Sequence, residues 1–134
     1  YDEAKTYLNK ALRIAPDYPA TYYLLADILL KEQSFKEAVP YFRKAIAAKP
    51  DDVDARIGLG QALAGLEQLA EALKELRQAA EMAPEEARVH FQLSRLYYRL
   101  GDEKRAEEEA ELSVKLRPPQ PLIVEVPSAL RGGP

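Results

Sequence analysis

Four prolines recur in this sequence at a constant interval, and this interval constrains the fold more than any other feature. They lie 34 residues apart, at Pro16, Pro50, Pro84 and Pro118. An alanine stands twelve residues before each proline, at Ala4, Ala38, Ala72 and Ala106. A fixed period of this length is typical of a chain built from repeated supersecondary units that stack on one another.

Small side chains occupy further positions of the same period. One such column holds Ala11, Ala45, Ala79 and Ser113, and another follows a periodic leucine, giving Leu25-Ala26, Leu59-Gly60 and Leu93-Ser94. Two helices approach closely only where one side chain is nearly absent, so these columns predict helix crossings. A bulky residue at Ala38 or Ala72 is expected to overpack the crossing, at a cost of about 1–3 kcal/mol.

Each period divides into two amphipathic helices by the i, i+3, i+4, i+7 rule. In the first complete unit they are predicted over residues 19–32 and 35–48, with Ser34 and Glu37 forming a capping box. In the last unit Gly101 separates the pair and Asp102 caps the helix that follows. Pro40 falls inside a second helix, where we expect it to remove one hydrogen bond and bend the axis.

The pattern resembles the tetratricopeptide repeat (TPR), a 34-residue helix–turn–helix unit. Three complete units carry its columns: Tyr22, Leu25, Ala26, Leu29, Ala38, Phe42, Ala45, Pro50; Arg56, Leu59, Gly60, Leu63, Ala72, Leu76, Ala79, Pro84; and His90, Leu93, Ser94, Tyr97, Ala106, Ala110, Ser113, Pro118. Arg56, His90 and Ala110 depart from the family's preference for large or aromatic residues, which weakens individual contacts.

The resemblance implies an all-α, right-handed α-solenoid of antiparallel helix pairs with about seven helices. The predicted repeat array covers residues 1–118: the second helix of a truncated repeat at 1–16, then repeats at 19–52, 53–86 and 87–118. Residues 119–134 form a predicted extended, Pro-rich tail with a strand-like segment at 122–126. Three interpretations of this tail stay open: packing on the last helix pair, disorder, or insertion into a neighbouring molecule.

By the same resemblance, the first helix of each repeat lines a concave groove that binds a peptide or partner subunit. The candidate groove residues are Tyr23, Asp27, Leu30, Lys31, Ile57, Gln61, Arg88, Phe91, Gln92, Arg95, Tyr98 and Arg99. Three of these are arginines at helical spacing among aromatic residues, a combination that suits an acidic or C-terminal peptide. The alternative is that the arginines balance the acidic outer helix, at Glu107, Glu108, Glu109 and Glu111.

Chaperone-binding members of the family hold a pair of carboxylates with Lys, Asn and Arg side chains. The matching positions here are Tyr23, Asp27, Gly58, Arg88 and Gln92. Only Arg88 keeps the charge, so we do not expect that mode of recognition.

No residue pattern indicates catalysis or a cofactor. The chain has no cysteine and one histidine, His90, which falls in a packing column, and Gly58, Gly60 and Gly65 lie within a helical segment. With 47% hydrophobic residues and a net charge of −3, we expect a soluble domain that binds no nucleic acid and inserts into no membrane. The compartment stays open between cytoplasm and periplasm.

We therefore predict a non-catalytic protein–protein interaction scaffold. Two alternatives remain from the sequence. One is a structural module that self-associates through the tail or the uncapped ends of the array. The other is the repeat arm of a larger enzyme.

Overall fold

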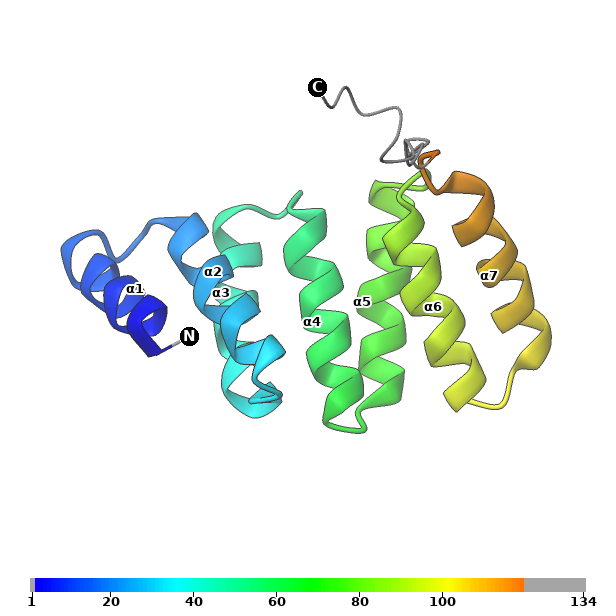
Figure 1. Ribbon diagram of the computed structural model, residues 1–134, viewed down its shortest axis with the longest axis horizontal. Helices are drawn as coiled ribbons and strands as arrows, with labels where there is room; N and C mark the ends of the chain where they lie inside the picture. The colour runs from blue at the N-terminus through cyan, green and yellow to red at the C-terminus, as the bar shows by residue number, and fades with distance from the viewer. Residues whose placement is uncertain (1, 120–134) are drawn as a thin grey trace, which may run out of the picture.

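The computed structural model describes residues 2–119 and contains, within them, seven α-helices and no strand. The helices are α1 (Asp2–Ile14), α2 (Pro19–Lys31), α3 (Phe35–Ala48), α4 (Val53–Gly65), α5 (Leu69–Met82), α6 (Ala87–Arg99) and α7 (Glu103–Leu116). They follow one another along the long axis of the molecule in chain order (Figure 1). The predicted all-α solenoid is confirmed.

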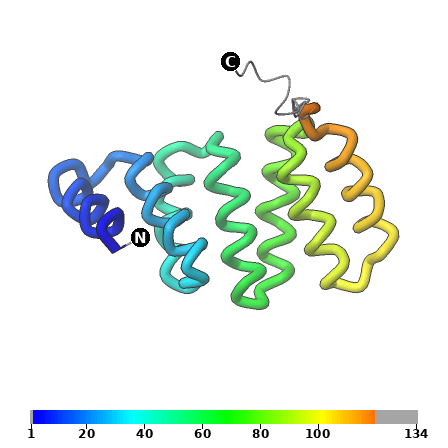
Figure 2. Tube along the Cα trace, viewed as in Figure 1, coloured from blue at the N-terminus to red at the C-terminus, as the bar shows by residue number. Residues whose placement is uncertain are grey.

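The helices pack as three hairpins, α2 with α3, α4 with α5 and α6 with α7, and α1 precedes them. The first helices of successive hairpins also touch, since α2 contacts α4 and α4 contacts α6. Within the described chain, α3, α5 and α7 make no comparable contacts with one another. The array therefore curves with α2, α4 and α6 on its inner side. Figure 2 shows the trace of the helices as a row along the long axis.

The small residues of the repeat lie at the closest helix crossings. Ala38, Ala72 and Ala106 are all 0% exposed. At Gly58 an added Cβ would lie 2.4 Å from two atoms of the Phe42 ring, which is itself fully buried. Ala4 is the exception and is exposed, because α2 is the one described helix that α1 contacts. The columns of small residues thus mark the places where helices meet.

A polar contact replaces the expected aromatic packing in two repeats. The guanidinium of Arg56 donates to the Pro50 carbonyl and to Glu75, and His90 bridges the Pro84 carbonyl and Glu109. In the first complete repeat the equivalent Tyr22 donates its hydroxyl to the Pro16 carbonyl and stacks on Tyr41. Arg56 and His90 thus make polar contacts at positions where the family prefers an aromatic residue. Each of these side chains links the end of the preceding repeat to the second helix of the repeat to which it belongs.

Helix termini follow the sequence signals in part. Asp102 caps α7 by accepting from the Arg105 amide at 3.2 Å, as predicted. Ser34 makes no side-chain capping hydrogen bond, so the predicted capping box is wrong. Its φ of −85° and ψ of 62° differ from the extended backbone typical of a capping residue.

The turn between the two helices of a repeat has a left-handed residue at one fixed position. Gln33 has φ 62°, Glu67 has φ 63° and Gly101 has φ 82°. Only the third repeat fills this position with glycine, the residue that adopts such a backbone without a steric penalty.

Two other sequence predictions concern Pro40 and the C-terminal tail. Pro40 lies within α3, which continues through it to Ala48, and the ring is exposed to solvent. The predicted extended tail lies outside the described residues, apart from Pro119.

Candidate functional site

A groove of about 460 Å³ opens on the inner side of the array between the first helices. We call it the central groove. Seven of the predicted residues line it: Asp27, Leu30, Lys31, Gln61, Gln92, Arg95 and Arg99. The remaining lining residues were not predicted as a site: Gln33, Phe35, Gly60, Ala64, Gly65, Leu76 and Leu96. The volume lies within the range of about 300–1,000 Å³ that is usual for ligand pockets.

Five predicted residues lie elsewhere. Tyr23, Arg88, Phe91 and Tyr98 are on the first helices but do not line the central groove. Ile57 is only 6% exposed and belongs to the hydrophobic core, so its placement on the groove surface was wrong. The reason is the central position of α4, which packs against α2, α3, α5 and α6 and is buried on nearly every side.

Glycine at position 65 keeps the central groove open. It occupies the position that Lys31 and Arg99 hold in the neighbouring repeats, so the period of the sequence carried a signal for it. A Cβ at Gly65 would lie 2.6 Å from two atoms of the Phe35 ring. The absent side chain leaves Phe35 and Ala64 as an apolar wall beside the polar residues of α6.

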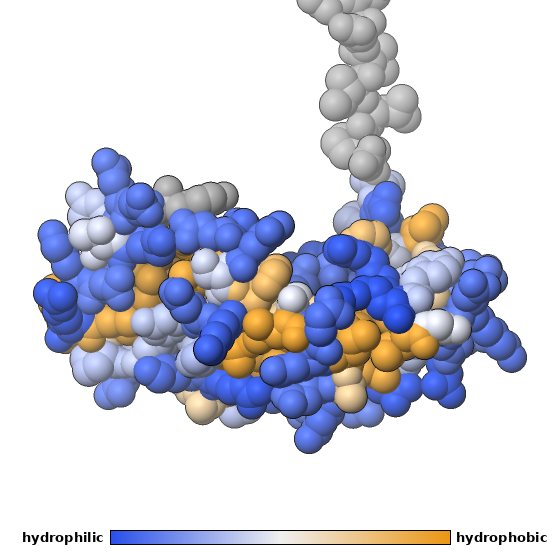
Figure 3. Space-filling model, turned by 90° about the horizontal axis from the view of Figure 1, so that it is seen from below, coloured by the Kyte–Doolittle hydropathy of each residue, from blue (hydrophilic) through white to orange (hydrophobic). Residues whose placement is uncertain are grey.

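Apolar side chains also gather along the edge formed by the turns between first and second helices. Figure 3 views the molecule from this side and shows a hydrophobic band flanked by hydrophilic residues. Leu100, which directly follows α6, is 43% exposed, and Phe35 and Leu69, which begin α3 and α5, are half-buried.

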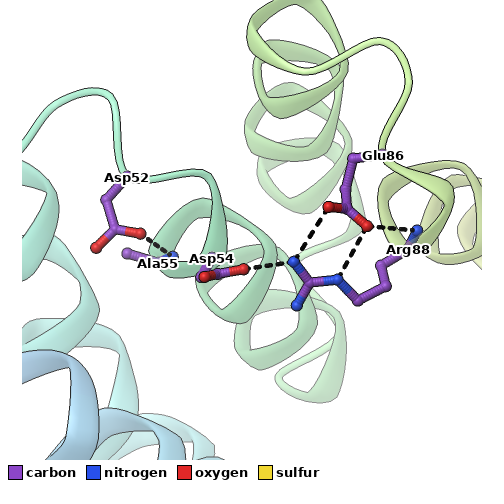
Figure 4. A network of polar contacts seen from close by, with 5 residues as sticks. All are labelled: Asp52, Asp54, Ala55, Glu86 and Arg88. Carbon is purple, nitrogen blue, oxygen red and sulfur yellow. Dashed lines mark hydrogen bonds and ion pairs between the residues drawn. The ribbon is translucent and has the colours of Figure 1, made fainter.

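The three candidate arginines differ in what holds them. Arg88 is enclosed by two carboxylates: its Nε and Nη2 donate to the two oxygens of Glu86 at 3.0 and 3.3 Å, and Nη2 lies 2.5 Å from Asp54 Oδ1 (Figure 4). The hydrogen bond that Arg88 donates lowers the pKa of Glu86, and the hydrogen bonds that Arg88 donates to Glu86 and Asp54 raise the pKa of Arg88. Asp52 lies nearby but caps α4 through the Ala55 amide.

Arg99 is partly engaged and Arg95 is not. Arg99 donates to the Ala64 carbonyl at 3.0 Å and to Glu67 at 2.7 Å, which satisfies the end of α4. Arg95 is exposed, lies 5.9 Å from the centre of the Phe91 ring, and pairs with no carboxylate in residues 2–119. Arg95 is therefore the arginine of the central groove whose charge stays available.

The alternative interpretation was that the arginines balance the glutamates of the outer helix, and the ion pairs of Arg88 and Arg99 involve other acids. Arg88 and Arg99 pair with Asp54, Glu86 and Glu67, and none of these lies on the outer helix α7. Of the α7 glutamates, Glu109 instead pairs with His90.

Tyr23 lies on α2 outside the central groove. It packs edge-on against Phe42, with 6.2 Å between ring centres. Burial raises the pKa of its hydroxyl, and the charges of Asp27 and Asp54 raise it further. The hydroxyl therefore stays neutral and serves as a polar group rather than a charge.

Neither a metal site nor a membrane segment is found in the part of the chain that the structure describes. No three His, Asp or Glu side chains there are placed to share an ion. None of the seven helices combines the length and the apolar run needed to cross a bilayer.

The curved stack of helix pairs with an inner groove defines a class, the helical-repeat scaffold for protein–protein interaction. The comparisons with known proteins give the family. Tetratricopeptide repeat profiles match residues 1–53, 29–90 and 63–123. The chain belongs to the tetratricopeptide repeat family.

Solved structures of the same family resemble the chain closely. MamA 41-end from Desulfovibrio magneticus RS-1 is 32% identical with a TM-score of 0.82, and the match covers 87% of this chain and 66% of that one. YrrB, described as a TPR protein with an unusual peptide-binding site, is 28% identical with a TM-score of 0.79, covering 87% and 60%. The match thus covers 66% of MamA 41-end and 65% of the MamA RS-1 ArsTM double mutant, just under two thirds of each. No curated protein matches it.

Proposed function

We propose that this chain, without catalysing a reaction, binds an extended peptide segment of a partner protein in the central groove, with a carboxylate of the peptide on Arg95. The proposal rests on the exposure of Arg95 and on the carboxylate partner that its guanidinium lacks among the described residues. It is an exposed guanidinium beside an aromatic ring, on the wall of a groove, without a carboxylate among the described residues.

The physical case rests on what binding would cost. Arg88 would have to leave two carboxylates, and Arg99 a carbonyl and a carboxylate, before either could bind a ligand. Arg95 needs no such exchange. A charge-assisted hydrogen bond to a ligand is therefore a net gain at Arg95, and the apolar wall at Phe35 and Ala64 supplies contact area.

The peptide-binding description of YrrB supports this type of ligand for a chain of the same fold. The ligand chemistry predicted here is a carboxylate, from an acidic side chain or from a C-terminus. Both would meet the same guanidinium.

The test is a selection from a library of random 12-residue peptides displayed on phage, with the immobilised chain as the target. A selected peptide is then synthesised and its affinity is measured for the wild type, for Arg95→Gln and for Arg88→Gln. Loss of one charge-assisted hydrogen bond predicts an affinity about tenfold lower for Arg95→Gln. Arg88→Gln is the matched control and is expected to bind as the wild type does. Equal affinity in all three proteins would show that Arg95 does not bind the peptide.

A second candidate function is self-association, and exposed apolar side chains at both ends of the array favour it. Ile14 and Tyr7 of α1 are 86% and 72% exposed, and Val114 of α7 is 68% exposed. Light scattering at increasing concentration tests this candidate on the full chain, on a chain truncated after Pro118, and on Ile14→Lys. A monomer at every concentration for the full chain rejects it.

A further inference from the structure

Three residues that line the central groove occupy one position of the repeat. Asp27, Gln61 and Arg95 lie 34 residues apart, on α2, α4 and α6 respectively. Because these helices are neighbours on the inner side of the array, the three side chains form a column along it. The column runs from an acid through a neutral amide to a base.

Among the described residues, an exposed ion pair holds the acidic end of the column. Asp27 pairs with Lys31 of its own helix at 2.9 Å, and the Lys31 side chain is 57% exposed. Exposed ion pairs of this i, i+4 kind contribute only about 0.3–0.5 kcal/mol. A basic group of a ligand can therefore replace Lys31 as the ion-pair partner of Asp27 at a small cost in free energy.

The middle of the column is the side-chain amide of Gln61. This side chain is half-buried and makes no hydrogen bond with any of residues 2–119. Its side chain carries both a donor and an acceptor, the same pair that each residue of an extended backbone presents. Gln61 therefore suits the main chain of a segment that passes between the two charged ends.

We infer that the central groove selects its partner by a charge pair of fixed separation: an extended segment with a basic side chain on Asp27 and an acidic side chain on Arg95. This inference rests on the proposed function and adds the sequence pattern of the ligand. An acidic side chain is the source of the carboxylate, because a free C-terminus is held by several donors at once, and Arg95 is the one cation of the groove that has no carboxylate partner among residues 2–119.

The separation follows from helix geometry. Packed helices lie about 8–10 Å apart, so the two steps from α2 to α6 span roughly 20 Å. An extended chain rises about 3.3 Å per residue, so the basic and acidic residues of the ligand are expected about six positions apart.

The test repeats the phage selection with the full chain and with two charge-reversed variants, Arg95→Glu and Asp27→Lys. The displayed peptides are fused at their C-terminus, so they carry no free terminal carboxylate. The wild type is expected to enrich peptides with a basic and an acidic residue five to seven positions apart. Arg95→Glu is expected to enrich a second basic residue in place of the acid, and Asp27→Lys a second acid in place of the base.

Two synthetic peptides of equal composition give the quantitative arm. One is a selected peptide, and the other has its basic and acidic residues moved to adjacent positions. The wild type is expected to bind the first about tenfold more tightly, because only separated charges reach both ends of the column.

The outcomes separate this inference from the proposed function. Peptides that bind the groove, with no preferred charge spacing and no change in the reversed variants, would overturn the charge-pair inference and leave the groove as a peptide site. Enrichment that depends on a free C-terminal carboxylate in a second, C-terminally exposed library would overturn it in favour of the other carboxylate source. A failure to enrich any peptide in either library would count against both.

Discussion

The Nδ1 atom of His90 lies 2.5 Å from Oε2 of Glu109, and the other ring nitrogen lies 2.7 Å from the carbonyl oxygen of Pro84. The same two positions of the preceding repeat hold Arg56 and Glu75, at 3.2 Å. A buried donor thus links three segments: the end of one repeat and both helices of the next. The first residue of the pair differs between the two repeats, but its position and its carboxylate partner are the same. A substitution at this position therefore has to supply a donor for that carboxylate.

We expect removal of this donor to destabilise the array. His90→Leu leaves the Pro84 carbonyl and the Glu109 carboxylate without their partner, which costs about 1–3 kcal/mol in the free energy of unfolding. His90→Arg, which copies the Arg56–Glu75 pair, is expected to lose less than about 1 kcal/mol. Urea denaturation measures both. A His90→Leu protein as stable as the wild type would show that the bridge contributes nothing.

Close packing between repeats is tested at Gly58. Gly58→Ala places a Cβ 2.4 Å from the buried Phe42 ring, and such overpacking typically costs about 1–3 kcal/mol. In the Phe42→Leu background the smaller side chain leaves room, so we expect the same substitution to cost much less. A double-mutant cycle by chemical denaturation checks this coupling, and additive costs would contradict it.

The turn between α2 and α3 offers a stabilising change. Gln33 has φ 62°, a backbone that side chains other than glycine adopt at a cost. We expect Gln33→Gly to raise the free energy of unfolding by up to about 1 kcal/mol, since the gain exceeds the entropy lost by glycine. Gln78→Gly is the control, because Gln78 is exposed within α5 and the substitution there should destabilise by about 1 kcal/mol. Equal effects at both positions would contradict the account of the turn.

Peptide binding should depend on salt through Arg95. The guanidinium is exposed, so added salt screens its attraction for a ligand carboxylate, and the affinity of a selected peptide is expected to fall as ionic strength rises. Fluorescence anisotropy over a series of NaCl concentrations measures the slope. Arg95→Gln should bind more weakly and show a shallower slope. An unchanged slope in that variant would mean that the ligand charge lies elsewhere.

The fold could be predicted from the sequence because residues that recur at a fixed interval mark the repeat boundaries and the helix crossings. The period of Pro16, Pro50 and Pro84 fixes the repeat boundaries, and the alanines at 38 and 72 mark the crossings. Both features depend on local backbone geometry and side-chain size, which recur in every repeat.

The site could be predicted only in outline, because its state depends on contacts between repeats. The period placed Arg88 and Arg95 on the inner helices. Which of them has a free charge depends on Asp54, which belongs to the preceding repeat. The burial of Ile57 likewise results from neighbours on both sides of α4. Gly65 was missed because an absent side chain carries no chemistry of its own, although its register with Lys31 and Arg99 could have indicated it.

NMR chemical-shift mapping shows directly whether a partner peptide lies in the central groove against Arg95. A selected peptide is titrated into the isotope-labelled chain, and the backbone and side-chain amide shifts are followed. We expect the largest changes at Gln61, Gln92 and Arg95. Changes confined to the outer helix α5, with the inner helices unaffected, would contradict this expectation.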